Sequence, residues 1–174
     1  MMGVTACKNE NKPATISAPI DLFDLKPLVQ KDIQQLTAKG CGIKKEVTID
    51  GKTQVQLLPN AGFAKELQPL LDCDINKASW KYKFTVDSTA LNGEKIITYS
   101  TSSDKVKVKM MQVFMDSCNT VKRVEIKKEI RSFTFSFDSQ IGYYPGKGYD
   151  IRSSQKAFLI HTFALQIHAA FTCQ

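Results

Sequence analysis

The side chains best suited to chemistry in this chain are two histidines and five cysteines. A serine-type hydrolase needs a base beside its nucleophile, yet His161 and His168 are seven residues apart in a predicted strand, on opposite faces. A hydrogen-bonded edge position is the better interpretation of His161. The sequence also lacks the GxSxG, HExxH and phosphate-binding glycine motifs. We therefore predict a non-enzymatic protein with no catalytic residue, no metal site and no cofactor.

Cys7 points to a different kind of chemistry. It follows a short run, Met1 to Ala6, that ends in small residues, and the polar residues 8–12 come after it. This arrangement looks like the cleavage and lipidation site of a bacterial lipoprotein, whose cysteine carries a diacylglycerol anchor. An export signal also needs an apolar stretch of about 7–15 residues, which Met1 to Ala6 do not supply. Either translation begins upstream of Met1, or Cys7 is an ordinary cysteine.

The four other cysteines are an even number, which suits an oxidising periplasm. Four cysteines permit three pairings, and sequence does not choose among them. We favour Cys41 with Cys73, because each follows a predicted helix and the bond would join neighbouring helix ends. Separate buried thiols, with Cys118 and Cys173 among them, are an equally good interpretation.

Length and composition indicate one domain. The chain has 174 residues, of which 43% are hydrophobic, and this is enough for a sizeable core. No apolar run approaches the roughly 20 residues that cross a bilayer as a helix. The net charge of +7 would attract anionic lipid headgroups or an acidic envelope protein. Nucleic acid is not a predicted partner, because no zinc-finger, RNP or helix-turn-helix pattern occurs.

Periodicity predicts the elements. Residues 1–19 are expected to form the lipobox-like N-terminus and a flexible tether, and residues 20–174 a single domain. Apolar residues spaced three and four apart predict an amphipathic helix over residues 20–39; they are Leu22, Leu25, Val29, Ile33 and Leu36. Asp50-Gly51 predicts a hairpin turn, and a second, short helix is expected before residue 72. From Trp80 onward the period is two, which is typical of strands.

These elements predict an α+β fold. One long and one short N-terminal helix would pack on a curved antiparallel meander of about six to eight strands, or on an incomplete barrel. In the first arrangement, an apolar face encloses a hydrophobic cavity with the helix 20–39 as a lid, and the protein binds a lipid or another apolar ligand. The residues expected to line this face are Phe133, Phe135, Phe137, Phe163, Leu165 and Ile167.

In the second arrangement, the same apolar residues form a filled core. The working surface is then a basic strand face formed by Lys105, Lys107 and Lys109, which binds a partner protein. Lys residues at alternate positions share one face of a strand, so all three would point the same way.

Several short motifs resemble a known group. They are the lipobox-like Cys7, Phe23-Asp24-Leu25-Lys26, Asp50-Gly51-Lys52, Lys65-Glu66-Leu67, Asp74-Ile75-Asn76-Lys77 and Gly148-Tyr149-Asp150-Ile151. Together they span most of the chain, and they resemble uncharacterised lipoproteins of Bacteroidetes-type bacteria. The resemblance implies a periplasmic or outer-membrane lipoprotein of unassigned activity, and of the two membranes we favour the outer one for a periplasm-facing lipid anchor.

Overall fold

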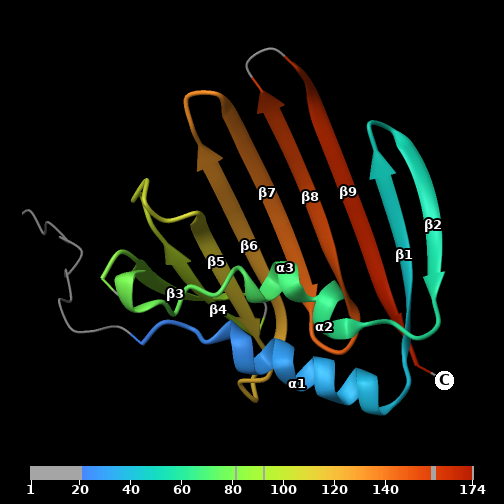
Figure 1. Cartoon of the computed structure of the whole chain (residues 1–174). Coiled ribbons are helices and arrows are strands. Elements are labelled where there is room, and N and C mark those ends of the chain that lie inside the picture. The colour runs from blue at the N-terminus through green and yellow to red at the C-terminus, as the bar shows by residue number, and fades with distance from the viewer. Residues whose placement is uncertain (1–20, 81, 92, 158–159, 174) are drawn as a thin grey trace, which may run out of the picture.

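Nine antiparallel strands form one sheet (Figure 1). The computed structural model describes residues 21–80, 82–91, 93–157 and 160–173. The predicted tether and Cys7 therefore lie outside the described residues. The strands are β1 (Gly42–Ile49), β2 (Lys52–Leu58), β3 (Thr85–Leu91), β4 (Glu94–Ser100), β5 (Val108–Met115), β6 (Val121–Arg131), β7 (Phe135–Tyr144), β8 (Gly148–Ala157) and β9 (Ile160–Thr172).

The order of strands in the sheet is β2-β1-β9-β8-β7-β6-β5-β4-β3. Strands β3 to β9 form a meander in which each strand pairs with the next. The hairpin β1–β2 joins this meander at its far end, because β1 pairs with β9. Asp50 and Gly51 form the predicted turn of this hairpin, with φ values of 46° and 84°. The first and last strands of the domain are thus neighbours.

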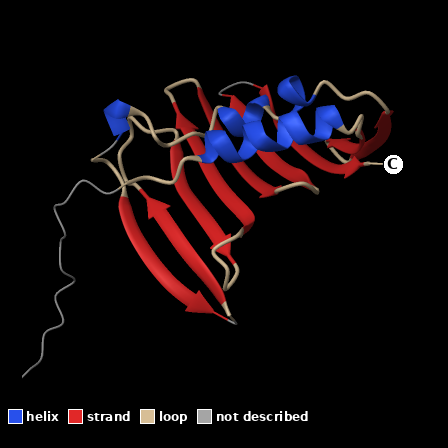
Figure 2. Ribbon diagram, turned by 90° about the horizontal axis from the view of Figure 1, so that it is seen from below, coloured by secondary structure: helices blue, strands red, loops and turns tan. Residues whose placement is uncertain are grey.

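All the helices lie on one face of the sheet, which we call the front face (Figure 2). Helix α1 (Leu25–Ala38) begins at Asp24, whose side chain accepts a hydrogen bond from the Lys26 N–H at 3.2 Å. Two single-turn helices, α2 (Phe63–Glu66) and α3 (Gln68–Leu71), follow β2, and a 3₁₀ turn η1 (Ala78–Trp80) precedes β3. Within the residues that the structure describes, the opposite face, which we call the back face, carries no helix (Figure 2).

The prediction of an α+β fold with a long helix over residues 20–39 and six to eight strands was wrong. The described residues are mostly a single nine-stranded antiparallel sheet, and the longest helix among them has 14 residues. The helix is shorter than predicted because the Asp24 cap fixes its start. The sheet is larger because β1 and β2 belong to it, through a pairing that spans nearly the whole domain. Local periodicity does not report such a pairing.

The core fills the space between the helices and one end of the sheet. Two cross-strand rows form its floor on the front face. One row is Val113, Val124, Tyr143, Tyr149 and Ala169, and the next is Met111, Ile126, Ile141, Ile151 and Ile167. Leu25, Val29 and Leu36 of α1 and Phe63, Leu67 and Leu70 of the short helices cover them. All of these side chains are buried except Ile167, which is half-buried. The helices therefore close a packed core.

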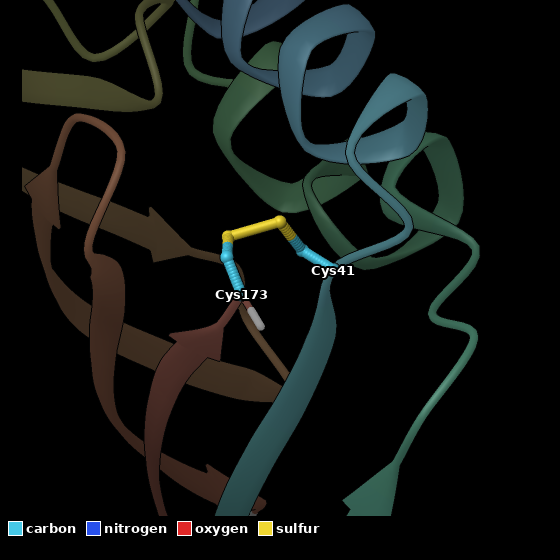
Figure 3. The surroundings of a disulfide bond; sticks show 2 residues. All are labelled: Cys41 and Cys173. Atoms are coloured by element: carbon cyan, nitrogen blue, oxygen red, sulfur yellow. A yellow bond between two sulfur atoms is a disulfide. The ribbon is translucent and has the colours of Figure 1, made fainter.

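A disulfide joins Cys41, just before β1, to Cys173, just after β9 (Figure 3). The predicted pairing of Cys41 with Cys73 was wrong. Register explains the observed pair: Gly42 lies opposite Thr172, so the next residues outward, Cys41 and Cys173, face each other with a Cα–Cα distance of 4.3 Å. Cys73 is instead a buried free thiol that donates a hydrogen bond to the Pro69 carbonyl at 3.1 Å.

The two free thiols that the structure describes differ in environment, and their reactivity should differ accordingly. Burial raises the pKa of Cys73 to about 11, so that roughly one molecule in a thousand is thiolate there at pH 8. Cys118 is exposed in the turn between β5 and β6. With Cys7 replaced by Ser, we expect a thiol reagent at pH 8 to titrate one thiol in the native protein and two after unfolding without reductant. A count of four after unfolding would contradict the disulfide.

Two buried or half-buried carboxylates attach the helices to the sheet. Asp32 of α1 is buried and accepts hydrogen bonds from the Tyr143 hydroxyl and the Gly146 N–H, both at 2.5 Å. Glu66 of α2 contacts the Lys45 ammonium at 2.7 Å and the Tyr149 hydroxyl at 3.1 Å. Burial, with these carboxylates as further causes, raises the pKa of both tyrosines above the ordinary range. Both tyrosines therefore stay protonated donors.

Candidate functional site

The helices cover only one end of the front face. Strands β6 to β9 and the hairpin β1–β2 continue well past them, toward the β6–β7 and β8–β9 turns (Figure 1). Helix α1 runs across the strands at one end of the sheet and spans part of its width, and no described element covers the distal part of the front face (Figure 1).

Apolar side chains occupy this uncovered part. Ile130, Phe137 and Phe163 stand in one cross-strand row, with Gln155 between the two phenylalanines. Phe135 lies one step farther out on β7, and Leu165 and Ile49 are paired one step closer to the core. We call this set the apolar patch: Ile49, Ile130, Phe135, Phe137, Phe163 and Leu165.

The patch remains in contact with solvent. Phe163 is 42% exposed and Ile49 43%, while the other four members are half-buried. None of the six belongs to the cluster of buried core residues. Polar residues of β8, Gln155 and Ser153, separate the β6–β7 members of the patch from its β9 and β1 members. Exposed apolar side chains gathered on one face of a folded protein commonly mark a binding surface.

Charge is distributed unevenly between the two faces. One row of the front face runs Lys52, Ile49, Leu165, Ser153, Ser139 and Lys128, so Lys52 stands at the β2 edge, and Lys128 stands next to the buried Val108 of β5. At the front-facing positions of β6 to β9, β1 and β2 that the structure describes, the register places no Asp or Glu. The carboxylates of these strands lie on the back face; they are Glu46, Glu125, Glu129, Asp138 and Asp150. The described strand positions around the apolar patch therefore carry lysines and no carboxylate, while Asp50 of the β1–β2 turn accepts a hydrogen bond from the Ala164 N–H beside the patch at 2.9 Å.

The structure places the six residues predicted to bind an apolar ligand in three different settings. Phe135, Phe137, Phe163 and Leu165 belong to the apolar patch. Ile167 points to the same face but packs against the core. Phe133 lies between β6 and β7 and is 97% exposed. The sequence analysis missed Ile49 and Ile130, although their strand parity could have identified them.

The predicted cavity beneath a helical lid is not what these residues form. Helix α1 and the short helices pack on the core, whereas the apolar patch lies beyond them on an open sheet surface (Figure 1). The helix is not a lid over the patch because α1 crosses the strands at one end of the sheet and the patch lies toward the other end. A ligand of the patch would lie on the sheet without being enclosed.

The predicted basic strand face does not form as expected. Lys105 and Lys107 precede β5 in an irregular segment, and only Lys109 lies in the strand. The Lys109 ammonium donates a hydrogen bond to the Ser103 carbonyl at 2.8 Å and is 4.0 Å from the Asp104 carboxylate. Lys105 and Lys107 are exposed on either side of the buried Val106, whereas the Lys109 ammonium is held by Ser103 and Asp104.

The remaining predicted site residues carry no reactive arrangement among the described residues. His168 lies on the back face with its Nδ1 2.5 Å from a carboxylate oxygen of Asp150. The side chain of His161, like Cys7, is outside the described part of the chain. Within the described ranges, no three His, Cys, Asp or Glu side chains gather as metal ligands would. The helices of those ranges include none with the length and apolar character needed to cross a bilayer.

Comparison with known proteins gave no match: no protein-family model, no curated protein and no solved structure is recognisably similar to this chain. The chemistry of the site has to be derived from its own residues.

Proposed function

We propose that this protein is a non-enzymatic lipid-binding protein of the bacterial cell envelope. The apolar patch contacts the acyl chains of anionic membrane lipids, and Lys52 and Lys128, which lie five strand spacings apart, contact the headgroups of different lipids. The observation that supports this proposal is the composition of the distal front face: partly exposed apolar side chains between two lysines, at strand positions without a carboxylate.

The physical argument combines two terms. Apolar area removed from water contributes about 25 cal/mol per Å², which favours acyl chains over water on the patch. Lysines near an anionic lipid surface contribute roughly 1 kcal/mol each. A neutral apolar ligand would use only the first term, so the lysines favour an anionic lipid.

The envelope location is part of the same proposal. A disulfide between Cys41 and Cys173 is typical of proteins in an oxidising compartment, which supports export. The lipobox-like position of Cys7 supports an anchor, and residues 8–19 would then give the domain reach to the membrane surface.

Vesicle binding tests the proposal with the full chain carrying Cys7→Ser, so that no attached acyl group contributes. We expect it to bind phosphatidylglycerol vesicles, and the double variant Phe137→Asp/Phe163→Asp to bind at least tenfold more weakly. Each Phe forfeits about 1.5–3 kcal/mol of burial, and each new carboxylate is repelled by the anionic surface. Co-sedimentation at low salt measures the change.

The matched control is Val55→Asp/Leu57→Asp. These two residues are also exposed and apolar, at 57% and 71%, but they lie on the back face of β2. Binding unchanged in this control and lost in the Phe pair supports the front face. Equal loss in both would show that general surface hydrophobicity is responsible. Lys52→Glu/Lys128→Glu should remove the preference for phosphatidylglycerol over phosphatidylcholine, and a preference that persists would exclude the headgroup role.

A further inference from the structure

A hollow opens in the middle of the back face, over Gly142 of β7. Gly142 stands in a cross-strand row between Glu125 of β6 and Asp150 of β8. Because glycine has no side chain, this position leaves a gap of about 220 Å³ between its neighbours. The hollow is smaller than the roughly 300–1,000 Å³ pockets of drug-sized ligands, so it suits a single ring.

One wall of the hollow is an aromatic ring. A Cβ built on Gly142 would lie 3.4 Å from the Tyr144 hydroxyl oxygen and 3.5–3.7 Å from carbons of its ring. The Tyr144 side chain therefore leans over the glycine, and Met110 also lines the hollow. A flat apolar surface of this type packs against the C–H face of another ring.

The rim is polar and balanced in charge. Glu125 and Asp150 flank Gly142, and Lys127 and Arg152 flank Gln140 in the next row. Each carboxylate has a further basic partner: the Arg123 Nε of the same strand is 3.1 Å from Glu125, and the Nδ1 of His168, the next residue in the row, is 2.5 Å from Asp150. Lys127 and Arg152 make no ion pair with a described residue. Two negative and two positive groups favour a neutral ligand.

Two further hollows adjoin the first. One, of about 320 Å³, is lined by residues of β7, β8 and β9 that include Gln140 and Gln166. The other, of about 260 Å³, is lined by residues of β1, β8 and β9 that include Glu46 and His168. Arg152 lines all three hollows, so they meet at its side chain. A ligand of several linked rings could lie across them.

We propose that the back face binds a neutral oligosaccharide of two or three units, with one sugar ring over Gly142 against Tyr144. A sugar presents hydroxyl donors to Glu125 and Asp150, hydroxyl acceptors to Lys127 and Arg152, and an apolar C–H face to the aromatic ring. A phosphate or carboxylate ligand would instead face two carboxylates, which disfavours it. This site is separate from the apolar patch, which lies on the opposite face of the sheet.

The test uses the full chain with Cys7→Ser and four probes: maltotriose, cellotriose, mannotriose and N,N′,N″-triacetylchitotriose. Saturation-transfer NMR detects binding, and calorimetric titration measures its affinity. We expect at least one probe to bind, and Arg152→Gln to weaken it about tenfold, as expected for loss of a hydrogen bond to a charged group. Gly142→Val, which fills the hollow with a side chain suited to a strand, should weaken it at least as much.

The matched control is Arg131→Gln, which removes the same charge from the back face of β6 but lines none of these three hollows. Affinity unchanged in this control, together with unchanged vesicle binding by Arg152→Gln, supports a distinct sugar site. The proposal is overturned if none of the four probes binds, if both hollow variants bind like the parent, or if sodium sulfate displaces the sugar and binds more tightly than it.

Discussion

Reduction of the disulfide between Cys41 and Cys173 should lower the free energy of unfolding by about 5 kcal/mol. The bond closes a loop across a sequence separation of 132 residues, and the chain-entropy estimate for a loop of this size gives about that value at 25 °C. For a domain of this size, such a loss lowers the Tm by roughly 10–20 °C. Urea unfolding of Cys41→Ala/Cys173→Ala, compared with the oxidised parent, measures the difference.

Two controls separate the bond from other effects of losing cysteines. Cys118→Ser alters an exposed free thiol and should leave stability unchanged. The parent chain in dithiothreitol should unfold at the same urea concentration as the double variant. If both reduced forms lost less than about 1 kcal/mol, the β1–β9 pairing alone would hold the two ends of the domain together, and the entropic role would be excluded.

The same pairing shows which parts of this fold are readable from the sequence. The Asp50-Gly51 turn and the alternating strands after residue 85 are local features. Both were predicted because a turn, or a period of two, can be recognised from residues that are neighbours in the sequence. The contact of β1 with β9 joins segments more than 100 residues apart. No local pattern encodes it, so the sheet size and the Cys41–Cys173 bond were predicted incorrectly.

The candidate site likewise has one part that could be predicted from the sequence and one part that could not. Strand parity predicted that Phe135, Phe137, Phe163 and Leu165 share a face, and the register places them there. The part of the sheet that the helices leave uncovered could not be predicted in this way, because it depends on the length and direction of α1 in the folded protein. A helix of 14 residues is about 21 Å long, and α1 lies across the strands. Strands of 10 to 13 residues are about 33–43 Å long. Because α1 crosses the strands, it covers only about its own diameter, roughly 10–12 Å, along their length, so the helices cover one end of the sheet only.

The back-face hollow had a weaker signal in the sequence. Gly142 follows Ile141 inside an alternating segment, and an isolated glycine there indicates a gap or a close approach. Its neighbours, Glu125 and Asp150, come from strands that only the register brings together. Alternation along β6 places its charged residues on one face but does not reveal the gap that Gly142 leaves beside Glu125.

Substitution of Asp32 is expected to have the second large effect on stability. It follows Leu25 and Val29 at spacings of seven and three, which places it on the buried stripe of α1, while the predicted Ile33 is only half-buried. We expect Asp32→Ala to lower the free energy of unfolding by about 3 kcal/mol. Removal of the carboxylate leaves the Tyr143 hydroxyl and the Gly146 N–H without their acceptor, and a buried unpaired polar group is costly.

A double-mutant cycle between Asp32→Ala and Tyr143→Phe assigns this loss. The Tyr143→Phe variant removes the donor but leaves Asp32 its bond to the Gly146 N–H, so it should cost less, about 1–2 kcal/mol. Because the two side chains share one hydrogen bond, the double variant should be more stable than the sum of the single losses predicts. Strict additivity would show that Asp32 acts on the β7–β8 turn alone. Coupling of at least 0.5 kcal/mol would establish that this buried pair fixes α1 to β7, and hence fixes which end of the front face stays uncovered.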